Sequence, residues 1–296
     1  MNNKRLHICV ALALLLLPLI AHAEFPATQP FPGITYSRET RQNPPMRLHW
    51  VIVDLTNPAL SLHVSPGGPD PDADGPFQTT LMKTSDIAAR DALDIAVNGD
   101  FFSATNPPEA GGQLTTRYAP GQWARVTGPA MTNARLWSKP RPASQSLVVT
   151  ATGQAIIVPS NNLPPDSRQV ISGNTLLLDK GNKVPHDNTQ IHPRTAVGLN
   201  ENATRLILLL VDGRRPLLSV GMSYSELSDE MLRLGCYTAI NLDGGGSSAL
   251  AIYDPASQHF RVLNQPSDGR ERAVANVLGI RAKTGSASTR PARSIR

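Results

Sequence analysis

The sequence predicts an α+β domain with a mixed β-sheet core, at least one βαβ crossover and a few helices. An apolar run over 205–211, followed by Asp-Gly-Arg, is typical of a buried strand. A capping box at Ser223 and Glu226 precedes apolar residues at helical spacing, with Gly235 as a helix terminator. A second apolar run covers 238–242. Strand, helix and strand in this order predict a right-handed crossover between parallel strands.

Other apolar segments are bounded by Gly, Pro and Asn and predict shorter strands. Ser85 is a candidate cap for a short helix that ends near residue 93. Few apolar runs occur in 111–135, which predicts a long surface loop. The strands are expected at 48–55, 60–64, 94–97, 147–149, 155–158, 175–178 and 275–280.

The first 23 residues are typical of a secretory signal peptide, with Lys4 and Arg5 before an apolar run and Ala-His-Ala at the cleavage site. Residues 24–46 form a predicted extended lead-in, 47–282 a single folded domain and 283–296 a basic disordered tail. Cys236 is the one cysteine after the signal, so no intrachain disulfide is expected. These features predict a periplasmic or secreted protein without stable membrane insertion after signal removal.

The net charge of +5 comes from the two ends of the chain. Seven of the 28 Lys and Arg residues lie in 1–23 and 281–296, which contain no acids, and the other 21 are outnumbered by 23 Asp and Glu. The centre therefore lacks the basic surface that nucleic acid binding requires. We expect no nucleic acid partner.

The most distinctive polar stretch follows the predicted strand at 238–242. Three successive glycines lose much backbone entropy on ordering, so a loop that keeps them needs positive φ angles or close main-chain approach. A tight turn is the alternative, but the surrounding carboxylate, amide and hydroxyl groups favour a ligand site. The residues concerned are Asn241, Asp243, Gly244, Gly245, Gly246, Ser247 and Ser248.

Further polar residues also lie near predicted strands. A crossover with parallel strands would bring Asp212 to the same sheet edge as Asp243. Paired carboxylates suit glycoside cleavage, one as acid and the other as base or nucleophile. Each residue also has a structural alternative, as a turn residue, a backbone acceptor or an ion-pair partner. The set is Asn98, Gly99, Asp100, His192, Arg194, Thr195 and Asp212.

Several other chemistries find little support. The chain has no His-rich or Cys-rich ligand set for zinc, and the glycine loop lacks the Lys of a P-loop. Residues 70–75 match the first half of a calcium loop, but Leu81 occupies the position of the required Glu. No cofactor is identified, the metal is unknown and a divalent cation stays open. A serine hydrolase using Ser247 with His192 is an alternative, although the G-x-S-x-G elbow is missing.

The order of these motifs resembles the phosphodiester glycosidases, over about residues 50–280. The combination of PRTAVG with NLDGGGSS is specific, whereas NGDFF alone is a weak signal. The matching segments are 98–102 (NGDFF), 193–198 (PRTAVG), 212–214 (DGR), 221–222 (GM), 241–248 (NLDGGGSS) and 272–276 (RAVAN).

The resemblance implies hydrolysis of a sugar-1-phosphodiester, such as an N-acetylglucosamine-1-phosphodiester, with a sugar-phosphate or polysaccharide of the envelope or exopolysaccharide as partner. Asp243 and Asp100 are then the candidate acid and base, and Asp212 orients them. Arg194, Ser247 and the glycine amides are candidates for holding the phosphate. A carbohydrate- or cell-wall-binding module that has lost turnover is the alternative from another functional class.

Overall fold

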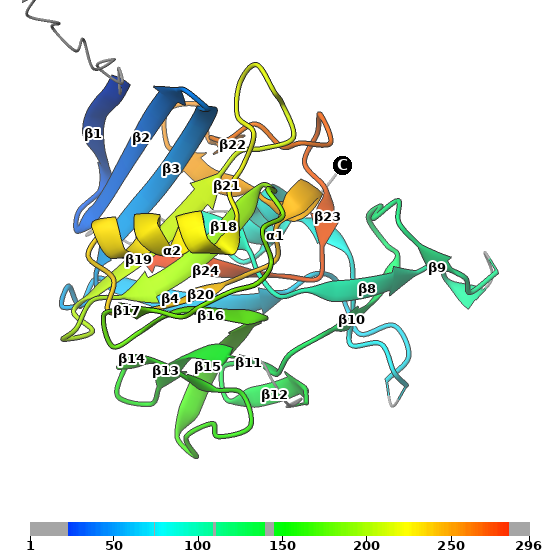
Figure 1. Ribbon diagram of the computed structural model, residues 1–296. Coiled ribbons are helices and arrows are strands. Elements are labelled where there is room, and N and C mark those ends of the chain that lie inside the picture. The colour runs from blue at the N-terminus through cyan, green and yellow to red at the C-terminus, as the bar shows by residue number, and fades with distance from the viewer. Residues whose placement is uncertain (1–22, 74, 109–110, 140–144, 284–296) are drawn as a thin grey trace, which may run out of the picture.

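The computed structural model describes residues 23–73, 75–108, 111–139 and 145–283 (Figure 1). These residues contain 24 strands and only two α-helices, of seven and ten residues. The predicted α+β class is therefore wrong, and the fold is predominantly β. The proposed signal peptide, except for its last residue, and the 283–296 tail, except for Lys283, lie outside the described residues.

An eight-stranded sheet, here called the large sheet, forms the centre of the molecule. All neighbouring strands in it are antiparallel, so the predicted mixed sheet is also wrong. Its strands in spatial order are β1 (Ala23–Phe31), β2 (Ile34–Gln42), β3 (Pro45–Asp54), β19 (Arg205–Val211), β18 (Arg194–Leu199), β20 (Thr238–Asn241), β16 (Thr175–Asp179) and β17 (Asn182–Lys183).

Strands β19 and β20 nevertheless point in the same direction, because both pair antiparallel with β18 between them. Helix α2 (Tyr224–Arg233) connects them across one face of the sheet. In the ladders, Arg194 is opposite Val211 and Ala196 is opposite Asn241. The last residues of β19 and β20 and the first residues of β18 thus lie together, at one end of the strands of the large sheet.

A five-stranded sheet, the second sheet, packs against the large sheet, and three further sheets complete the fold. The second sheet contains β22 (His259–Val262), β21 (Leu250–Asp254), β7 (Ile95–Asn98), β24 (Asn276–Ala282) and β4 (Leu60–Pro66). One of the further sheets has five strands, β12 (Arg135–Ser138), β11 (Ala130–Thr132), β15 (Ser167–Gly173), β13 (Gln145–Thr150) and β14 (Ala155–Pro159). Another has four strands, β5 (Thr79–Thr80), β10 (Trp123–Val126), β8 (Phe102–Thr105) and β9 (Leu114–Thr115). The last consists of β23 (Ala273–Val274) and β6 (Met82–Lys83).

The side chains of β19 show how the layers are held together. Leu206, Leu208 and Leu210 point into the core shared with the second sheet, whereas Ile207 and Leu209 pack on the α2 side. The run is apolar throughout because both faces are covered. Burial on both faces does not require parallel neighbours. The strand–helix–strand order did not give a mixed sheet, because β18 lies between β19 and β20 and pairs antiparallel with both.

The second sheet is covered on its outer face by helix α1 (Thr84–Arg90). Ile87 and Ala88 pack there with Ala96 and Val277. The layers are therefore α1, second sheet, large sheet and α2. The N-cap position of α1 is Lys83 and not Ser85, whose amide and hydroxyl bind the Glu271 carboxylate instead.

Two regions, the extended lead-in and the long loop expected from the sequence, belong to sheets. Residues 24–46 form β1, β2 and the start of β3, so the lead-in belongs to the large sheet. Residues 111–135, expected as one long loop, contain β9, β10, β11 and the first residue of β12. None of the helices in the described residues is long and apolar enough to cross a membrane.

Replacing the α2 cap should lower stability without changing the fold. The Ser223 hydroxyl accepts a hydrogen bond from the Glu226 amide, and the Glu226 carboxylate accepts one from the Ser223 amide. Ser223→Ala should cost about 1 kcal/mol and lower Tm by about 2–4 °C. The matched control is Ser61→Ala, at an exposed strand position. Equal melting temperatures for the two variants would contradict a stabilising cap.

Candidate active site

The glycine loop leaves the large sheet after β20 and is fixed by main-chain hydrogen bonds to neighbouring segments. The Asp243 amide donates to Gly99 O (2.9 Å) and the Gly245 amide to Pro193 O (2.9 Å). The Gly244 amide donates to Oδ1 of Asp243 (2.9 Å). A short 3₁₀ turn, Gly245–Ser247, follows. The loop therefore holds the Asp243 carboxyl at the seam between β7, β18 and β20.

The three glycines are required by close packing and backbone conformation. A Cβ at Gly244 would lie 2.6 Å from Pro193 O, and one at Gly246 would overlap the guanidinium of Arg272. Gly245 has a φ of +62°, which L side chains rarely adopt. The prediction of close approach and positive φ in this loop is confirmed.

Two buried amide side chains lock this seam. Asn98 donates to Asp243 O (2.6 Å) and accepts from the Thr195 hydroxyl (2.8 Å) and the Ala249 amide (3.2 Å). Thr195 also contacts the Ser248 hydroxyl (3.2 Å). Asn241, the other buried amide, donates to Leu242 O and Asn174 Oδ1. The structure therefore brings Asn98, Thr195, Asn241 and Ser248 together as supports of the loop.

Asp243 is partly buried at the edge of this seam. Burial raises the pKa of its carboxyl to about 6, while the nearby Ser247 hydroxyl and the guanidinium groups of Arg272 and Arg214 act to lower it. At neutral pH the group is mostly ionised, and it can exchange a proton close to that pH. This is the range in which a general base or nucleophile works.

Asp100 is more deeply enclosed, with 2% of its surface exposed. Its Oδ1 accepts from the Ser172 amide (2.9 Å) and its Oδ2 from Asn276 Nδ2 (2.5 Å). Burial nevertheless raises the pKa of Asp100 to about 8, and the charge of Asp243 adds to the rise. Asp100 is therefore neutral at pH 7, next to an ionised Asp243. Different environments have separated the pKa values of the two carboxyls.

Asp212 follows β19 at the same end of the large sheet as Asp243, but its carboxylate bonds to a different set of residues. Its Oδ1 accepts from Asn264 Nδ2 (3.2 Å) and the Gln265 amide (3.0 Å), and its Oδ2 lies 3.5 Å from His49 Nε2. Asn264 in turn donates to Ser248 O (3.0 Å). Asp212 thus supports the end of the glycine loop through Asn264.

Arg194, expected to hold phosphate, is buried and has contacts within the protein. Its Nε donates to Met222 O (2.8 Å), its Nη2 donates to Gln190 O (2.7 Å), and its guanidinium stacks 4.2 Å from the Tyr224 ring centroid. Only 4% of its surface is exposed. Through its bond to Gln190 O, Arg194 helps to fix the segment that precedes β18.

Two other arginines flank the glycine loop and were missing from the predicted site. Arg214 lies against Gly245 and within 3.4 Å of His192 Nδ1. Arg272 lies against Gly246, is ion-paired with Asp268 (2.8 Å) and stacks on Tyr118. Burial and the nearby charges of Arg214 and Arg194 lower the pKa of His192. Both arginines were visible as parts of the DGR and RAVAN motifs, but the motifs alone did not place them at the loop.

The arrangement offers one reactive carboxylate between two cationic groups. A cavity of about 320 Å³ is lined by Arg272, Asp268 and Tyr118 among others, and it reaches the glycine loop through Arg272, which lies against Gly246. Ser247 Oγ is buried and has no hydrogen-bond partner of normal geometry in the described residues. Among the described residues, no three His, Cys, Asp or Glu side chains are grouped so that they could hold a metal ion. The site is thus suited to an anionic substrate that reacts at a carboxylate.

Comparison with known proteins shows the family of the chain. The family model described as phosphodiester glycosidase matches residues 91–281. An uncharacterised protein from a Bacillus subtilis prophage region, YomE, is 40% identical over 89 residues, which cover 30% of this chain and 13% of that protein.

Two solved structures share the fold. A hypothetical protein from Synechocystis has a TM-score of 0.55 at 15% identity, covering 86% of this chain and 63% of that one. The zebrafish N-acetylglucosamine-1-phosphodiester alpha-N-acetylglucosaminidase catalytic domain, auto-inhibited by its pro-peptide, has a TM-score of 0.58 at 19% identity, covering 88% of both chains. At these identities the likeness establishes the fold.

The raised pKa of Asp100 predicts a specific dependence of stability on pH. Its folded pKa of about 8 exceeds the ordinary 3.8, so the folded state holds a proton that the unfolded state releases between these values. This contribution is fully present below pH 4 and is lost as pH rises toward 8. Asp100→Asn should therefore flatten the fall of unfolding free energy between pH 5 and 8 in urea titrations. Exposed Asp166→Asn is the matched control, and an unchanged slope in Asp100→Asn would contradict the assignment.

Proposed function

Because the chain belongs to the phosphodiester glycosidase family, we propose that it is an exported hydrolase that cleaves a sugar-1-phosphodiester of the N-acetylglucosamine-1-phosphodiester kind. The natural material would be an envelope or exopolysaccharide polymer. The signal-like N-terminus supports export, and the named activity of the zebrafish structural relative supports the substrate class.

The observation that carries this proposal is the position of Asp243 between Arg214 and Arg272. A phosphodiester has one negative charge that guanidinium groups bind with charge-assisted hydrogen bonds. With the phosphate held there, the bond between the anomeric carbon and the phosphate oxygen lies near the carboxylate. Water supplies the hydroxyl that ends on the anomeric carbon, and the electron pair of the broken bond leaves with the phosphate.

Asp243 acts in its ionised form. It either attacks the anomeric carbon or takes the proton of the attacking water, and both roles need the free carboxylate. Asp100 keeps its proton at neutral pH, so it adds no second negative charge beside the substrate phosphate. The kcat/KM value should therefore rise as pH increases through about 6, the pKa of Asp243.

Asp243→Asn is the direct test of this role. The change keeps the size of the side chain but removes the charge, so kcat on a sugar-1-phosphodiester should fall by roughly 10²–10⁴. The rise of kcat/KM near pH 6 should disappear, while Tm stays near that of the parent. Ser247→Ala should retain most activity. If Ser247→Ala is inactive and Asp243→Asn is active, the enzyme is a serine hydrolase and the proposal is wrong.

Arg272 provides a second test, aimed at substrate binding. Arg272→Gln removes the positive charge beside Gly246 and should raise KM about tenfold, equivalent to one charge-assisted hydrogen bond. Arg272→Lys keeps the charge but loses the forked geometry of the guanidinium, so its KM should lie between those of the parent and Arg272→Gln. The control is Arg168→Gln, an equal charge change at an exposed position on β15. Equal KM values for Arg272→Gln and Arg168→Gln would remove Arg272 from phosphate binding.

A further inference from the structure

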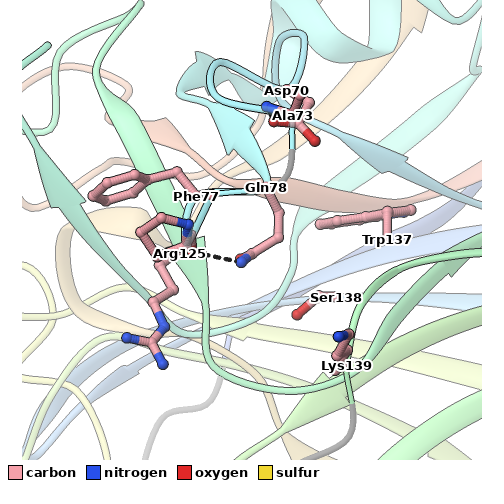
Figure 2. A pocket seen from close by; sticks show the side chains of 10 residues that line it. Asp70, Ala73, Phe77, Gln78, Arg125, Trp137, Ser138 and Lys139 are labelled. Atoms are coloured by element: carbon pink, nitrogen blue, oxygen red, sulfur yellow. Dashed lines mark hydrogen bonds between the residues drawn. The ribbon is translucent and has the colours of Figure 1, made fainter.

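A groove separate from the glycine loop crosses the hairpin of β11 and β12. It consists of two cavities, of about 350 and 450 Å³, that share Asp70, Gln78 and Trp137. Figure 2 shows the first cavity, with Phe77 and Arg125 on one side and Trp137 and Lys139 on the other. Because both cavities border the same indole, they form successive sites along one path.

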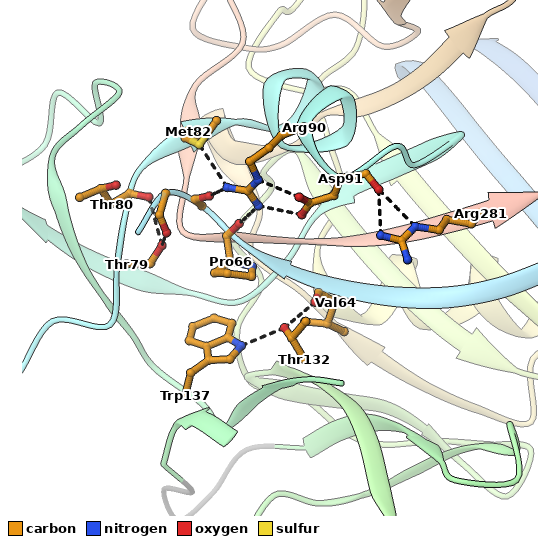
Figure 3. A network of polar contacts seen from close by, with 12 residues as sticks. Val64, Pro66, Thr79, Thr80, Met82, Arg90, Asp91, Thr132, Trp137 and Arg281 are labelled. Atoms are coloured by element: carbon orange, nitrogen blue, oxygen red, sulfur yellow. Dashed lines mark hydrogen bonds and ion pairs between the residues drawn. The ribbon is translucent and has the colours of Figure 1, made fainter. Parts of the chain in front are cut away.

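The indole of Trp137 is fixed in place by a short hydrogen-bonded chain. Its Nε1 donates to the Thr132 hydroxyl (3.0 Å), which donates to Val64 O (2.6 Å), as Figure 3 shows. The polar atom of the ring is therefore satisfied inside the protein. What remains for a ligand is the apolar surface of an immobilised ring, which suits the C–H face of a sugar.

Each cavity also has an arginine without an ion pair in the part of the chain that the structure describes. Arg125 on β10 lines the first cavity, Arg135 on β12 lines the second, and both are exposed. Lys139 adds a third positive charge at the first cavity. Asp70 is the acid in both, and its Oδ1 is occupied by the amides of Asp72 and Ala73.

Gln78 shapes the path between these charges. Its side chain donates to Pro76 O (2.6 Å) and accepts from the Val126 amide (3.0 Å), so it is held rigidly between the loop and β10. A preformed site of this kind loses little entropy on binding a ligand. Alternation of cation, aromatic ring and cation matches a polymer in which sugar rings alternate with negative charges.

The groove and the candidate active site share a wall. Ser138, which lines the first cavity, donates to Gly128 O (2.7 Å). A Cβ at Gly128 would lie 3.2 Å from Oδ1 of Asp100. Gly128 therefore lies close to both Ser138 of the groove and the carboxyl of Asp100.

We propose that this groove binds an anionic saccharide chain. One sugar ring packs on the indole of Trp137, and the acidic groups of the neighbouring units bind Arg125 and Arg135. Two positions for negative charge, one on each side of an aromatic ring, favour a repeating glycan over a single small anion. The groove holds the polymer by contacts that are independent of the reaction at Asp243.

Calorimetric titration of the full protein with trigalacturonate tests the proposal, with neutral galactotriose and inorganic phosphate as separate ligands. Arg125→Gln, Arg135→Gln and Trp137→Ala should each weaken trigalacturonate binding about tenfold, equivalent to one charge-assisted contact or ring contact. Arg168→Gln, with the same charge change outside the groove, should bind like the parent. Galactotriose should bind at least tenfold more weakly than trigalacturonate.

Three results would contradict the proposal that the groove binds an anionic saccharide chain. Unchanged trigalacturonate binding in the double variant Arg125→Gln/Arg135→Gln, which alters only exposed side chains, would do so even if Trp137→Ala fails to fold. Phosphate binding as tight as trigalacturonate would indicate a simple anion site. Loss of trigalacturonate binding in Arg272→Gln, with the groove variants unaffected, would place the ligand at the glycine loop. Because turnover is not the readout, failure of the proposed hydrolysis would leave these results intact.

Discussion

The structure depends on the junction between its two main sheets, where Asn98 and Gly99 bond to the backbone of Asp243. Asn98 donates to Asp243 O, and Gly99 O accepts from the Asp243 amide, so the end of β7 in the second sheet is tied to the loop after β20 in the large sheet. Segments that are distant in sequence are thereby fixed at one point. Asn98 is fully buried, and loss of its side chain would remove the hydrogen-bond partner of Asp243 O, of the Ala249 amide and one of the two partners of the Thr195 hydroxyl. The loop geometry and the core packing therefore have to form together.

The same junction explains why two nearby aspartates behave differently. Asp100 follows β7 into the space between β15 and β24, where its donors are one backbone amide and the Asn276 side chain. Those donors favour the charged form, but complete burial outweighs them and keeps the group neutral. Asp243 lies only two residues beyond the end of β20 and stays partly exposed, close to Arg214 and Arg272. One site thus contains a carboxylate and a carboxylic acid at the same pH.

The sequence revealed the local features of this protein better than its topology. Periodicity located β19, the capped helix α2 and the strand before Asp243, because each depends on neighbours in sequence. It did not show that β18 inserts between β19 and β20, since strand pairing is set by contacts that the linear pattern does not contain.

Asp243 and its glycines were identified because three glycines beside an acid are locally unusual. Arg214 and Arg272 were not placed, because they reach Gly245 and Gly246 from loops that are 31 and 26 residues away in the sequence. Arg194 is a conspicuous motif residue, and two of its five N–H donors bind backbone carbonyls, so its expected role at a phosphate stays a prediction.

The protonation pattern of the site also bears on which substrates suit it. Cleavage of an ordinary glycoside needs a protonated carboxyl that can reach the departing oxygen, because an alkoxide is a poor leaving group. Asp100 holds a proton but is almost entirely enclosed, with both oxygens engaged by Ser172 and Asn276. A phosphate that departs from an anomeric carbon is already stabilised as an anion, and it needs cationic partners more than a proton. Arg214 and Arg272 are cations of that kind, and they lie at the loop that carries Asp243. The arrangement of one edge carboxylate, two arginines and an inaccessible acid is therefore better matched to a sugar phosphodiester than to a simple glycoside.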